Sequence, residues 1–184
     1  LAKLKTTFSV IDNIITNIKK DITNAEKIYE NFLTQVFSNK NKNWDEANLK
    51  ELTTKIGSGS TPKGGSKSYK DSGISLIRSM NVYDKGFVYN KLAFIDDAQA
   101  KKLNVVNIEK EDVIINITGA SVARCCVVPS DILPARVNQH VSILRTKKNI
   151  LNPKLLHFIL ISPYHKNKLL KTGEEGGATR QAIT

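Results

Sequence analysis

Several side chains in this sequence can form two hydrogen bonds side by side. A guanidinium fork matches the edge of guanine or a phosphate, and a carboxamide matches the edge of adenine. Hydroxyl groups complement such contacts because they can both donate and accept. The candidates for DNA contact are the forks Arg78, Arg124, Arg136 and Arg180, the amides Asn81, Asn138, Gln139 and Gln181, the hydroxyls Ser60, Thr61, Thr118 and Ser121, and the imidazole His140. Many of them fall at predicted strand ends or in a glycine-rich segment, where they could converge.

Each candidate also has a plainer interpretation, as an exposed polar residue or as a partner in a structural hydrogen bond. Gln139 and His140 have the apolar neighbours Val137 and Val141, so half-burial is the alternative for them.

A glycine-rich segment precedes the first predicted strand of the chain's second part. It reads Gly57-Ser-Gly-Ser-Thr-Pro-Lys-Gly-Gly-Ser-Lys67. A phosphate-cradling P-loop requires Gly-Lys followed by Ser or Thr, five residues after the first Gly. Neither Gly57 nor Gly59 is followed by that pattern, which argues against a P-loop NTPase. Backbone donors, hydroxyls and Lys63, Lys67 and Lys70 in such a loop predict non-catalytic phosphate contact. A flexible connector is the alternative.

The sequence offers no convincing catalytic or metal-binding arrangement. The three histidines share no metal-ligand spacing, and no Gly-x-Ser-x-Gly nucleophile elbow is present. Cys125 and Cys126 are adjacent, so their side chains point to opposite faces of a strand, and we expect one core and one half-buried thiol. We therefore predict a non-enzymatic chain with no catalytic residue, no metal and no cofactor.

Composition narrows the class of protein further. The 184 residues include 28 Lys and Arg and 17 Asp and Glu, so the formal charge is 28 − 17 = +11. With 40% apolar and 24% charged residues the chain can fold, and two cysteines do not make a disulfide scaffold. Residues 51–184 carry 20 basic and 11 acidic groups, or +9, which suggests a polyanionic partner, with simple solubility charge as the alternative. Without a membrane-length apolar run or a signal-peptide pattern, we expect a cytoplasmic protein and a fragment of a longer one.

The first 38 residues have the apolar pattern of a coiled coil. Apolar or aromatic residues follow one another at alternating spacings of three and four, and neither Gly nor Pro interrupts them. This seam consists of Leu1, Leu4, Phe8, Ile11, Ile15, Ile18, Ile22, Ala25, Tyr29, Phe32 and Val36. A sustained 3.5-residue period predicts a helix of about 55 Å that must bury its seam against a partner. Packing of the helix on the chain's own globular part is the alternative.

The rest of the chain reads as a mixed domain. Residues 39–43 form a polar linker, and residues 44–184 form the domain. Apolar runs predict strands at 74–78, 92–95, 113–117, 122–128 and 137–144, and helices are expected at 96–103 and 152–170. Because the strands and helices lack a regular βαβ rhythm, the fold class is α+β, with a long N-terminal coiled-coil helix followed by a mixed domain.

An ordered set of segments resembles the specificity subunit of type I restriction-modification systems. The segments are 1–12 and 25–37 in the helix, 56–62 leading to 73–79, 112–119, 121–128 and 138–140, and finally 176–184. The segments cover nearly the whole chain. Their occurrence together in this order identifies the family more specifically than any single segment does.

The resemblance implies a central conserved helix followed by one DNA target recognition domain. In that family each such domain reads one half of a bipartite target, while the helices set the separation of the domains and hold the methylation subunits. The implied partners are double-stranded DNA and the methylation (M) and restriction (R) subunits, while the apolar seam of the helix predicts self-association or a helical partner. The pairing helix and the other recognition domain are not in this sequence.

Two other functions are possible interpretations of the sequence. The second is an assembly adaptor whose basic domain binds another protein. The third is the recognition part of a fused methyltransferase, which ranks last because the cofactor loop is missing.

Overall fold

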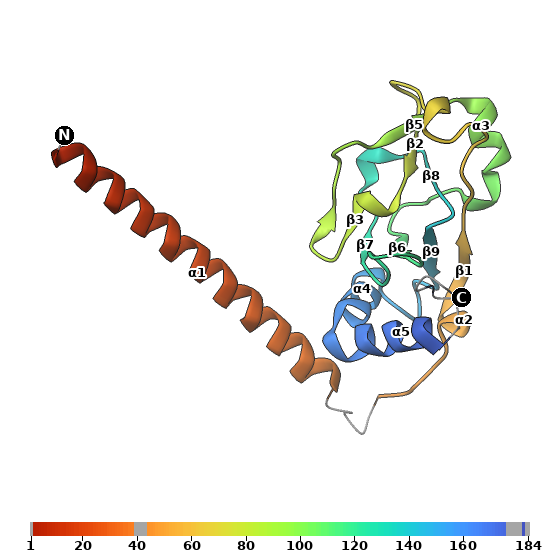
Figure 1. The fold of residues 1–184 in the computed structure, drawn as a ribbon. Coiled ribbons are helices and arrows are strands. Elements are labelled where there is room, and N and C mark those ends of the chain that lie inside the picture. The colour runs from red at the N-terminus through yellow and green to blue at the C-terminus, as the bar shows by residue number, and fades with distance from the viewer. Residues whose placement is uncertain (1, 39–43, 176–181, 183–184) are drawn as a thin grey trace. The chain divides into compact units, whose positions relative to one another are not determined.

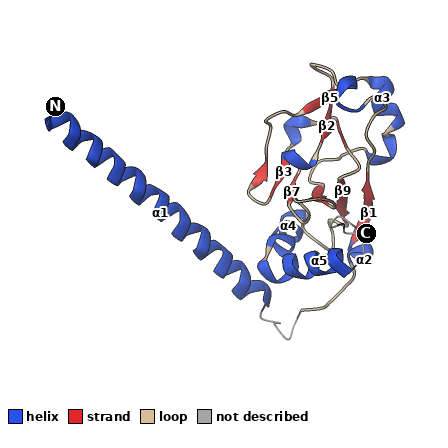
Figure 2. Cartoon of the chain, viewed as in Figure 1, coloured by secondary structure: helices blue, strands red, loops and turns tan. Residues whose placement is uncertain are grey.

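The computed structural model describes residues 2–38, 44–175 and 182, and it divides the chain into two compact units, residues 1–40 and 41–184. Figure 1 traces the chain and Figure 2 marks its helices and strands.

The helices are α1 (Ala2–Ser38), α2 (Leu49–Leu52), α3 (Asp97–Lys102), α4 (Pro153–Ile161) and α5 (Pro163–Glu175). The strands are β1 (Thr53–Ser58), β2 (Ile74–Ile77), β3 (Val82–Tyr83), β4 (Gly86–Phe87), β5 (Ala93–Ile95), β6 (Val113–Asn116), β7 (Cys125–Val127), β8 (Ala135–Val137) and β9 (Val141–Thr146). Short 3₁₀ helices are η1 (Gly65–Ser68), η2 (Ser79–Asn81), η3 (Asn104–Val106) and η4 (Ser130–Ile132).

The first unit is the continuous helix α1 of 37 residues, so the predicted long N-terminal helix is confirmed. Its apolar seam is largely exposed. The large seam side chains Leu4, Phe8, Ile11, Ile15, Ile18, Ile22, Tyr29 and Phe32 are each 44% to 60% exposed. No helix in the described part of the chain is long and apolar enough to span a membrane.

The second unit contains a four-stranded antiparallel sheet, β1-β9-β6-β7, and a three-stranded sheet, β5-β2-β8. In the smaller sheet β2 pairs antiparallel with β5 and parallel with β8. The β3–β4 hairpin, which the sequence analysis did not predict, forms a separate pair. The core of the unit is aliphatic, with Leu76, Ile95, Ile114 and Ile143 fully buried. This mixture of short strands and helices confirms the α+β class.

The predicted strand over 137–144 is two strands that belong to different sheets. β8 ends at Val137 in the small sheet, and β9 begins at Val141 in the large sheet. Between them, Asn138 keeps its backbone N–H bonded to the carbonyl of Ile77, at 3.0 Å. The polar residues 138–140 therefore make a turn where the chain passes from one sheet to the other.

The predicted helix over 152–170 is broken into α4 and α5. Asn152 caps α4, because its side chain accepts a hydrogen bond from the N–H of Lys154 at 2.9 Å, and Pro153 occupies the first turn. Ser162 is extended, with φ −60° and ψ 139°, since a residue before proline avoids the helical region. α4 contacts β6 and β7, and so covers one face of the large sheet.

Candidate nucleic-acid interface

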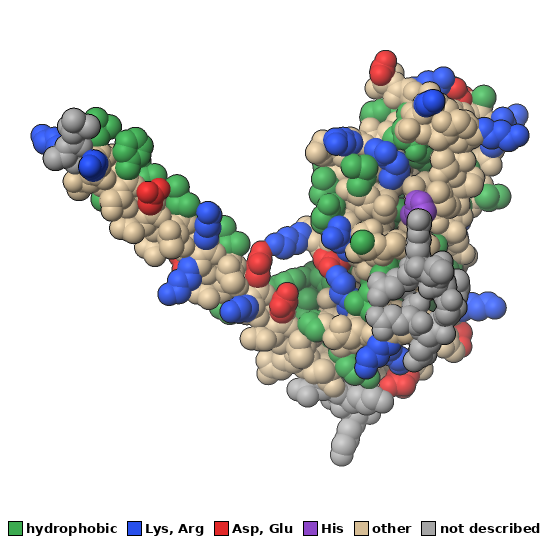
Figure 3. All heavy atoms as spheres, viewed as in Figure 1, with side chains coloured by type: hydrophobic (Ala, Val, Ile, Leu, Met, Phe, Trp, Pro, Cys, Tyr) green, Lys and Arg blue, Asp and Glu red, His purple; other side chains and the backbone are tan. Residues whose placement is uncertain are grey.

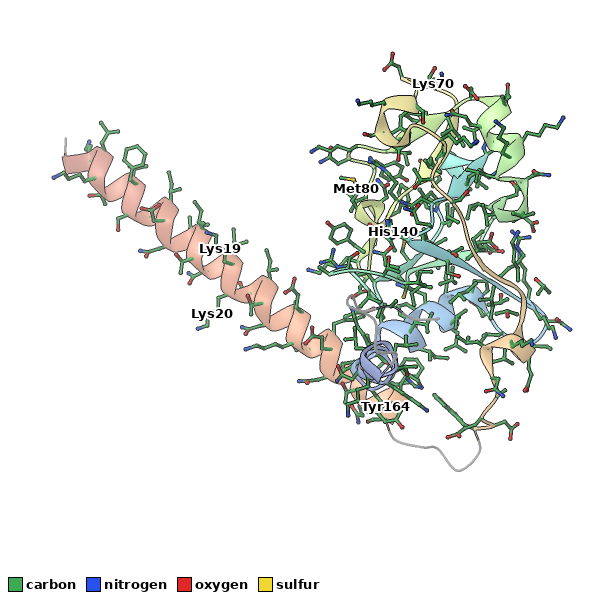
Figure 4. All side chains as sticks on the ribbon, turned by 45° about the vertical axis from the view of Figure 1, so that its right-hand side comes forward. Lys19, Lys20, Lys70, Met80, His140 and Tyr164 are labelled. Carbon is green, nitrogen blue, oxygen red and sulfur yellow. The ribbon has the colours of Figure 1, made fainter. Side chains whose placement is uncertain are left out.

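Three connections of the 41–184 unit are joined by a chain of side-chain hydrogen bonds. The hydroxyl of Thr61, in the β1–β2 loop, donates to Oε1 of Gln139 in the β8–β9 turn. Nε2 of Gln139 lies 3.0 Å from Nε2 of His140, and Nδ1 of His140 lies 2.6 Å from Oγ1 of Thr118 in the β6–β7 loop. We call these four residues the polar relay; Figure 4 labels His140 within it. The structure thus brings together candidates that the sequence places 78 residues apart.

Backbone hydrogen bonds hold the three connections in place beneath the relay. Gly59 donates to the carbonyl of Asn138 at 3.1 Å, and Ile117 donates to the carbonyl of His140 at 3.0 Å. The loop passes so close to β8 that a Cβ on Gly59 would lie 1.7 Å from the carbonyl oxygen of Val137. Any side chain at this position would push the β1–β2 loop away from the turn, so the glycine is required by the close approach.

Asn116, which the sequence analysis did not select, attaches a further segment to this region. Its side chain is fully buried at the end of β6. Nδ2 donates to the carbonyl of Ser79 in η2 at 2.9 Å and to Oγ of Ser121 at 3.1 Å. Met80, labelled in Figure 4, follows Ser79 and is 38% exposed. The sequence signal for this role was an asparagine at the end of an otherwise apolar run. A buried amide at such a position needs hydrogen-bond partners, and neighbouring loops supply them.

Two candidate arginines rest on aromatic rings at the edge of this region. The guanidinium carbon of Arg124 lies 4.7 Å from the centre of the Tyr83 ring, and that of Arg78 lies 5.3 Å from the Tyr69 ring. Arg78 also donates to the carbonyl of Lys91. Both arginines are half-buried, and stacking holds the planar group while leaving hydrogen-bond donors for another partner.

Arg136 and the two candidate asparagines lie in the interior. Arg136 is 7% exposed, and its guanidinium donates to Oδ1 of Asn107 at 2.6 Å and to the carbonyl of Ala135 at 3.0 Å. Burial lowers the pKa of Arg136. Asn81 is fully buried and donates to the carbonyl of Val88 at 2.8 Å, and Asn138 is 5% exposed. These side chains support the fold, so we leave all three out of the proposed contact set, contrary to the expectation from sequence.

The remaining candidates differ in their surroundings. Ser60, Lys63 and Lys67 are exposed in the β1–β2 loop. Arg180 and Gln181 lie outside the described residues. Figure 3 shows Lys and Arg side chains at several places on the visible face of the 41–184 unit, not gathered into one patch. On this face the cationic groups are therefore spread out, while four of the candidate hydrogen-bonding side chains meet in the relay.

The two cysteines are buried, which corrects the expectation that one would be half-exposed. Cys126 belongs to the core, and the other face of β7 is covered by α4. Burial raises the pKa of Cys126 to about 12 and raises that of Cys125 still further. Neither thiol is a nucleophile at neutral pH as a result. Within the described residues, no three His, Cys, Asp or Glu side chains come together as a metal site.

The other two histidines lie in α4 and α5 and predict a pH dependence of stability. Nε2 of His157 lies 3.1 Å from the carbonyl oxygen of Cys125, and Nδ1 of His165 lies 3.0 Å from Oγ of Ser162. Burial lowers the pKa of both imidazoles below about 6.5, the value in an unfolded chain. The unfolded state therefore takes up protons first as the pH falls, and folding loses stability.

We expect the free energy of unfolding to fall between about pH 7 and pH 5. His157→Gln should flatten this dependence, because an amide can donate to the Cys125 carbonyl without titrating. Urea unfolding of both proteins at several pH values measures the effect. Parallel curves for wild type and variant would contradict the role given to His157.

The sequence matches no protein-family model and no curated protein. Solved structures do match it. One, described as the structural basis of complex assembly and conformational transition of the type I R-M system, covers 100% of this chain at 17% identity, with a TM-score of 0.64. The HsdS subunit from Thermoanaerobacter tengcongensis covers 89% at 16% identity, with a TM-score of 0.54. The type I restriction-modification S subunit from M. genitalium covers 95% at 16% identity, with a TM-score of 0.60.

These alignments span 43%, 40% and 43% of the solved chains, respectively, so this chain corresponds to less than half of each. The first alignment spans the whole chain, so it includes both α1 and the mixed unit. The chain therefore has the fold of the S subunits of type I restriction-modification systems.

Proposed function

We propose that residues 44–184 are a DNA target recognition domain that reads one half of a bipartite target. Residues 1–38 would be its spacer helix and residues 39–43 the linker. In this proposal the chain directs methylation and restriction subunits to DNA in the cytoplasm, and catalysis belongs to those partners.

The observation that carries the proposal is the polar relay, in a chain with the fold of S subunits. Base reading needs side chains with free donors and acceptors, held at defined positions. Thr61, Gln139, His140 and Thr118 are exposed or half-buried, and they are fixed by one another. The formal charge of +9 on residues 51–184 supplies the attraction to phosphate that such reading requires.

The proposed contact set combines the relay with nearby hydroxyl and cationic groups. It consists of Ser60, Thr61, Lys63, Lys67, Arg78, Thr118, Ser121, Arg124, Gln139 and His140. The lysines would contact phosphates, because a flexible ammonium group finds a phosphate easily but discriminates poorly between bases. The Gln139 amide of the relay and the stacked arginines would contact base edges.

We also propose that α1 associates through its seam, with a second copy or with a helix of a methylation subunit. The exposed large apolar side chains on one continuous helix support this. A helix with such a continuous apolar stripe normally buries it against a partner.

Binding to duplex DNA at several salt concentrations tests the domain's proposed function. A few phosphate contacts predict a non-specific Kd in the ~10⁻⁴–10⁻⁶ M range that rises steeply with salt. Lys63→Ala and Lys67→Ala should each weaken binding to all sequences alike and reduce the salt slope by about one. Fluorescence anisotropy of the full chain with labelled duplexes gives both quantities.

Lys154→Ala is the matched control, since Lys154 is an exposed lysine in the first turn of α4, outside the contact set. The salt dependence of DNA binding by Lys154→Ala should have the same slope as that of the wild type. Absence of DNA binding, or binding that ignores salt, would overturn the proposal and favour an adaptor that binds another protein.

A further inference from the structure

The amide of Gln139 is an exposed side chain whose two polar atoms are both already engaged. Oε1 accepts from the hydroxyl of Thr61, and Nε2 faces Nε2 of His140 at 3.0 Å. A carboxamide has two lone pairs on oxygen and two hydrogens on nitrogen. Each atom therefore keeps one position free, so Gln139 can still offer one acceptor and one donor, side by side, to a ligand.

The protonation of His140 follows from its neighbours. An amide nitrogen can only donate, so Nε2 of His140 must accept from Gln139 and carries no hydrogen. The neutral imidazole then has its hydrogen on Nδ1, where it donates to Oγ1 of Thr118 at 2.6 Å. In this arrangement the Thr118 hydroxyl accepts, and turning the Gln139 amide over would require the tautomer of His140 and both threonine hydroxyls to reverse with it.

The backbone of His140 is held as firmly as its ring. Its N–H donates to Oδ1 of Asn138 at 3.0 Å, and its carbonyl accepts from the N–H of Ile117 at 3.0 Å. Because Asn138 is itself buried and anchored to β2, the imidazole has a fixed place in the turn between β8 and β9. The folded domain therefore holds the imidazole that faces the Gln139 amide in place before any ligand binds.

We infer that Thr61, His140 and Thr118 are positioning residues that set the donor–acceptor order of the Gln139 amide and thereby its choice of base. Adenine offers an N–H donor and an acceptor nitrogen side by side in the major groove, the complement of a carboxamide held in one orientation. The inference rests on the proposed function, since it assigns to one amide the reading of one adenine. A freely rotating amide would present both orders equally and would discriminate less.

The test is a binding selection from a duplex library randomised over one half-site, followed by sequencing. Gln139→Ala should remove an adenine preference at one position. Thr61→Val and Thr118→Val each remove one hydroxyl at nearly constant volume, and should reduce the same preference about tenfold while leaving other positions unchanged. Thr61→Ser and Thr118→Ser keep the hydroxyl and should keep the preference. Affinity for scrambled duplex should fall less than affinity for the selected half-site, and the melting temperature should stay the same.

Thr172→Val is the matched control, because the Thr172 hydroxyl donates to the carbonyl of Lys168 on α5 and takes no part in the relay. Loss of preference at all positions together in the Val variants would mean that the relay only supports the fold, and would overturn the inference. Unchanged preference in those variants, or in Gln139→Ala, would also overturn it while leaving DNA recognition by the domain intact. Failure of the wild-type chain to bind DNA would instead overturn the proposed function.

Discussion

A chain in which Ile15 and Ile22 are both replaced by Asp is expected to stay monomeric where the wild-type chain associates through α1. Both isoleucines occupy the same heptad position of the seam and are 44% and 54% exposed. Fully burying such a side chain stabilises an assembly by about 1.5–3 kcal/mol, and an unpaired carboxylate in the same place costs more. The double change therefore makes the free energy of association less favourable by about 4 kcal/mol or more, which raises the Kd roughly a thousandfold.

Sedimentation velocity over a range of concentrations, with and without methylation subunits, measures the association. Asn17→Asp with Asn24→Asp is the matched control, because it adds the same two charges seven residues apart on the exposed polar side of α1. This control should associate like wild type. A wild-type chain that is monomeric at high concentration under both conditions would show that the seam has no helical partner.

The long helix could be predicted because its signal is local. The alternation of three and four residues from Leu1 to Val36 is complete, and a helix needs only neighbours within four residues for its hydrogen bonds. The same holds for α3, which falls within the helix predicted over 96–103. Its cap is local, because the Asp96 carboxylate accepts from the N–H of Gln99 at 2.8 Å. What the helix packs against depends on groups outside its own sequence, and no local pattern supplies that information.

The sequence did not predict where the chain changes sheets. Half of residues 137–144 are apolar, and apolarity alone does not distinguish one strand from two that belong to different sheets. The bonds that stop β8 come from Ile77 and Gly59, some 60 to 80 residues earlier. The relay was foreseen only as a general convergence of polar groups at strand ends, because its pairing of Thr61 with Gln139 exists only once both sheets are formed.

Arg136 illustrates the same limit for individual side chains. A guanidinium flanked by apolar residues is compatible both with a base-reading fork and with a buried structural group. The partners that decide between the two, Asn104 and Asn107, belong to the segment after α3 and are about thirty residues away. Long-range contacts thus changed the interpretation of this residue, while the exposed lysines of the β1–β2 loop kept theirs.

Asp112→Ala is expected to destabilise the 41–184 unit more than removal of any surface charge. Asp112 is 1% exposed and forms a two-pronged ion pair with Arg145 of β9, with both N–O distances at 2.8 Å. It also accepts from the N–H of Glu109 at 2.8 Å. Removing the carboxylate leaves this N–H without its partner and leaves the guanidinium with only Glu109 and the carbonyl of Asn107. Breaking a buried pair in this way costs about 3–5 kcal/mol. The melting temperature should fall by roughly 6–20 °C.

The exposed pair Glu111 and Lys148 provides the control, because it joins the same two regions of the chain at 2.7 Å with side chains 47% and 58% exposed. Glu111→Ala should change the melting temperature little, since solvent screens such a pair.

Arg145→Met should lower the stability as much as Asp112→Ala, because it leaves the buried carboxylate without its cation. The double variant Asp112→Ala with Arg145→Met should lose much less stability than the sum of the two single losses. Additive effects, measured by thermal and urea unfolding, would show that the two side chains act independently and that the pair does not join β6 to β9.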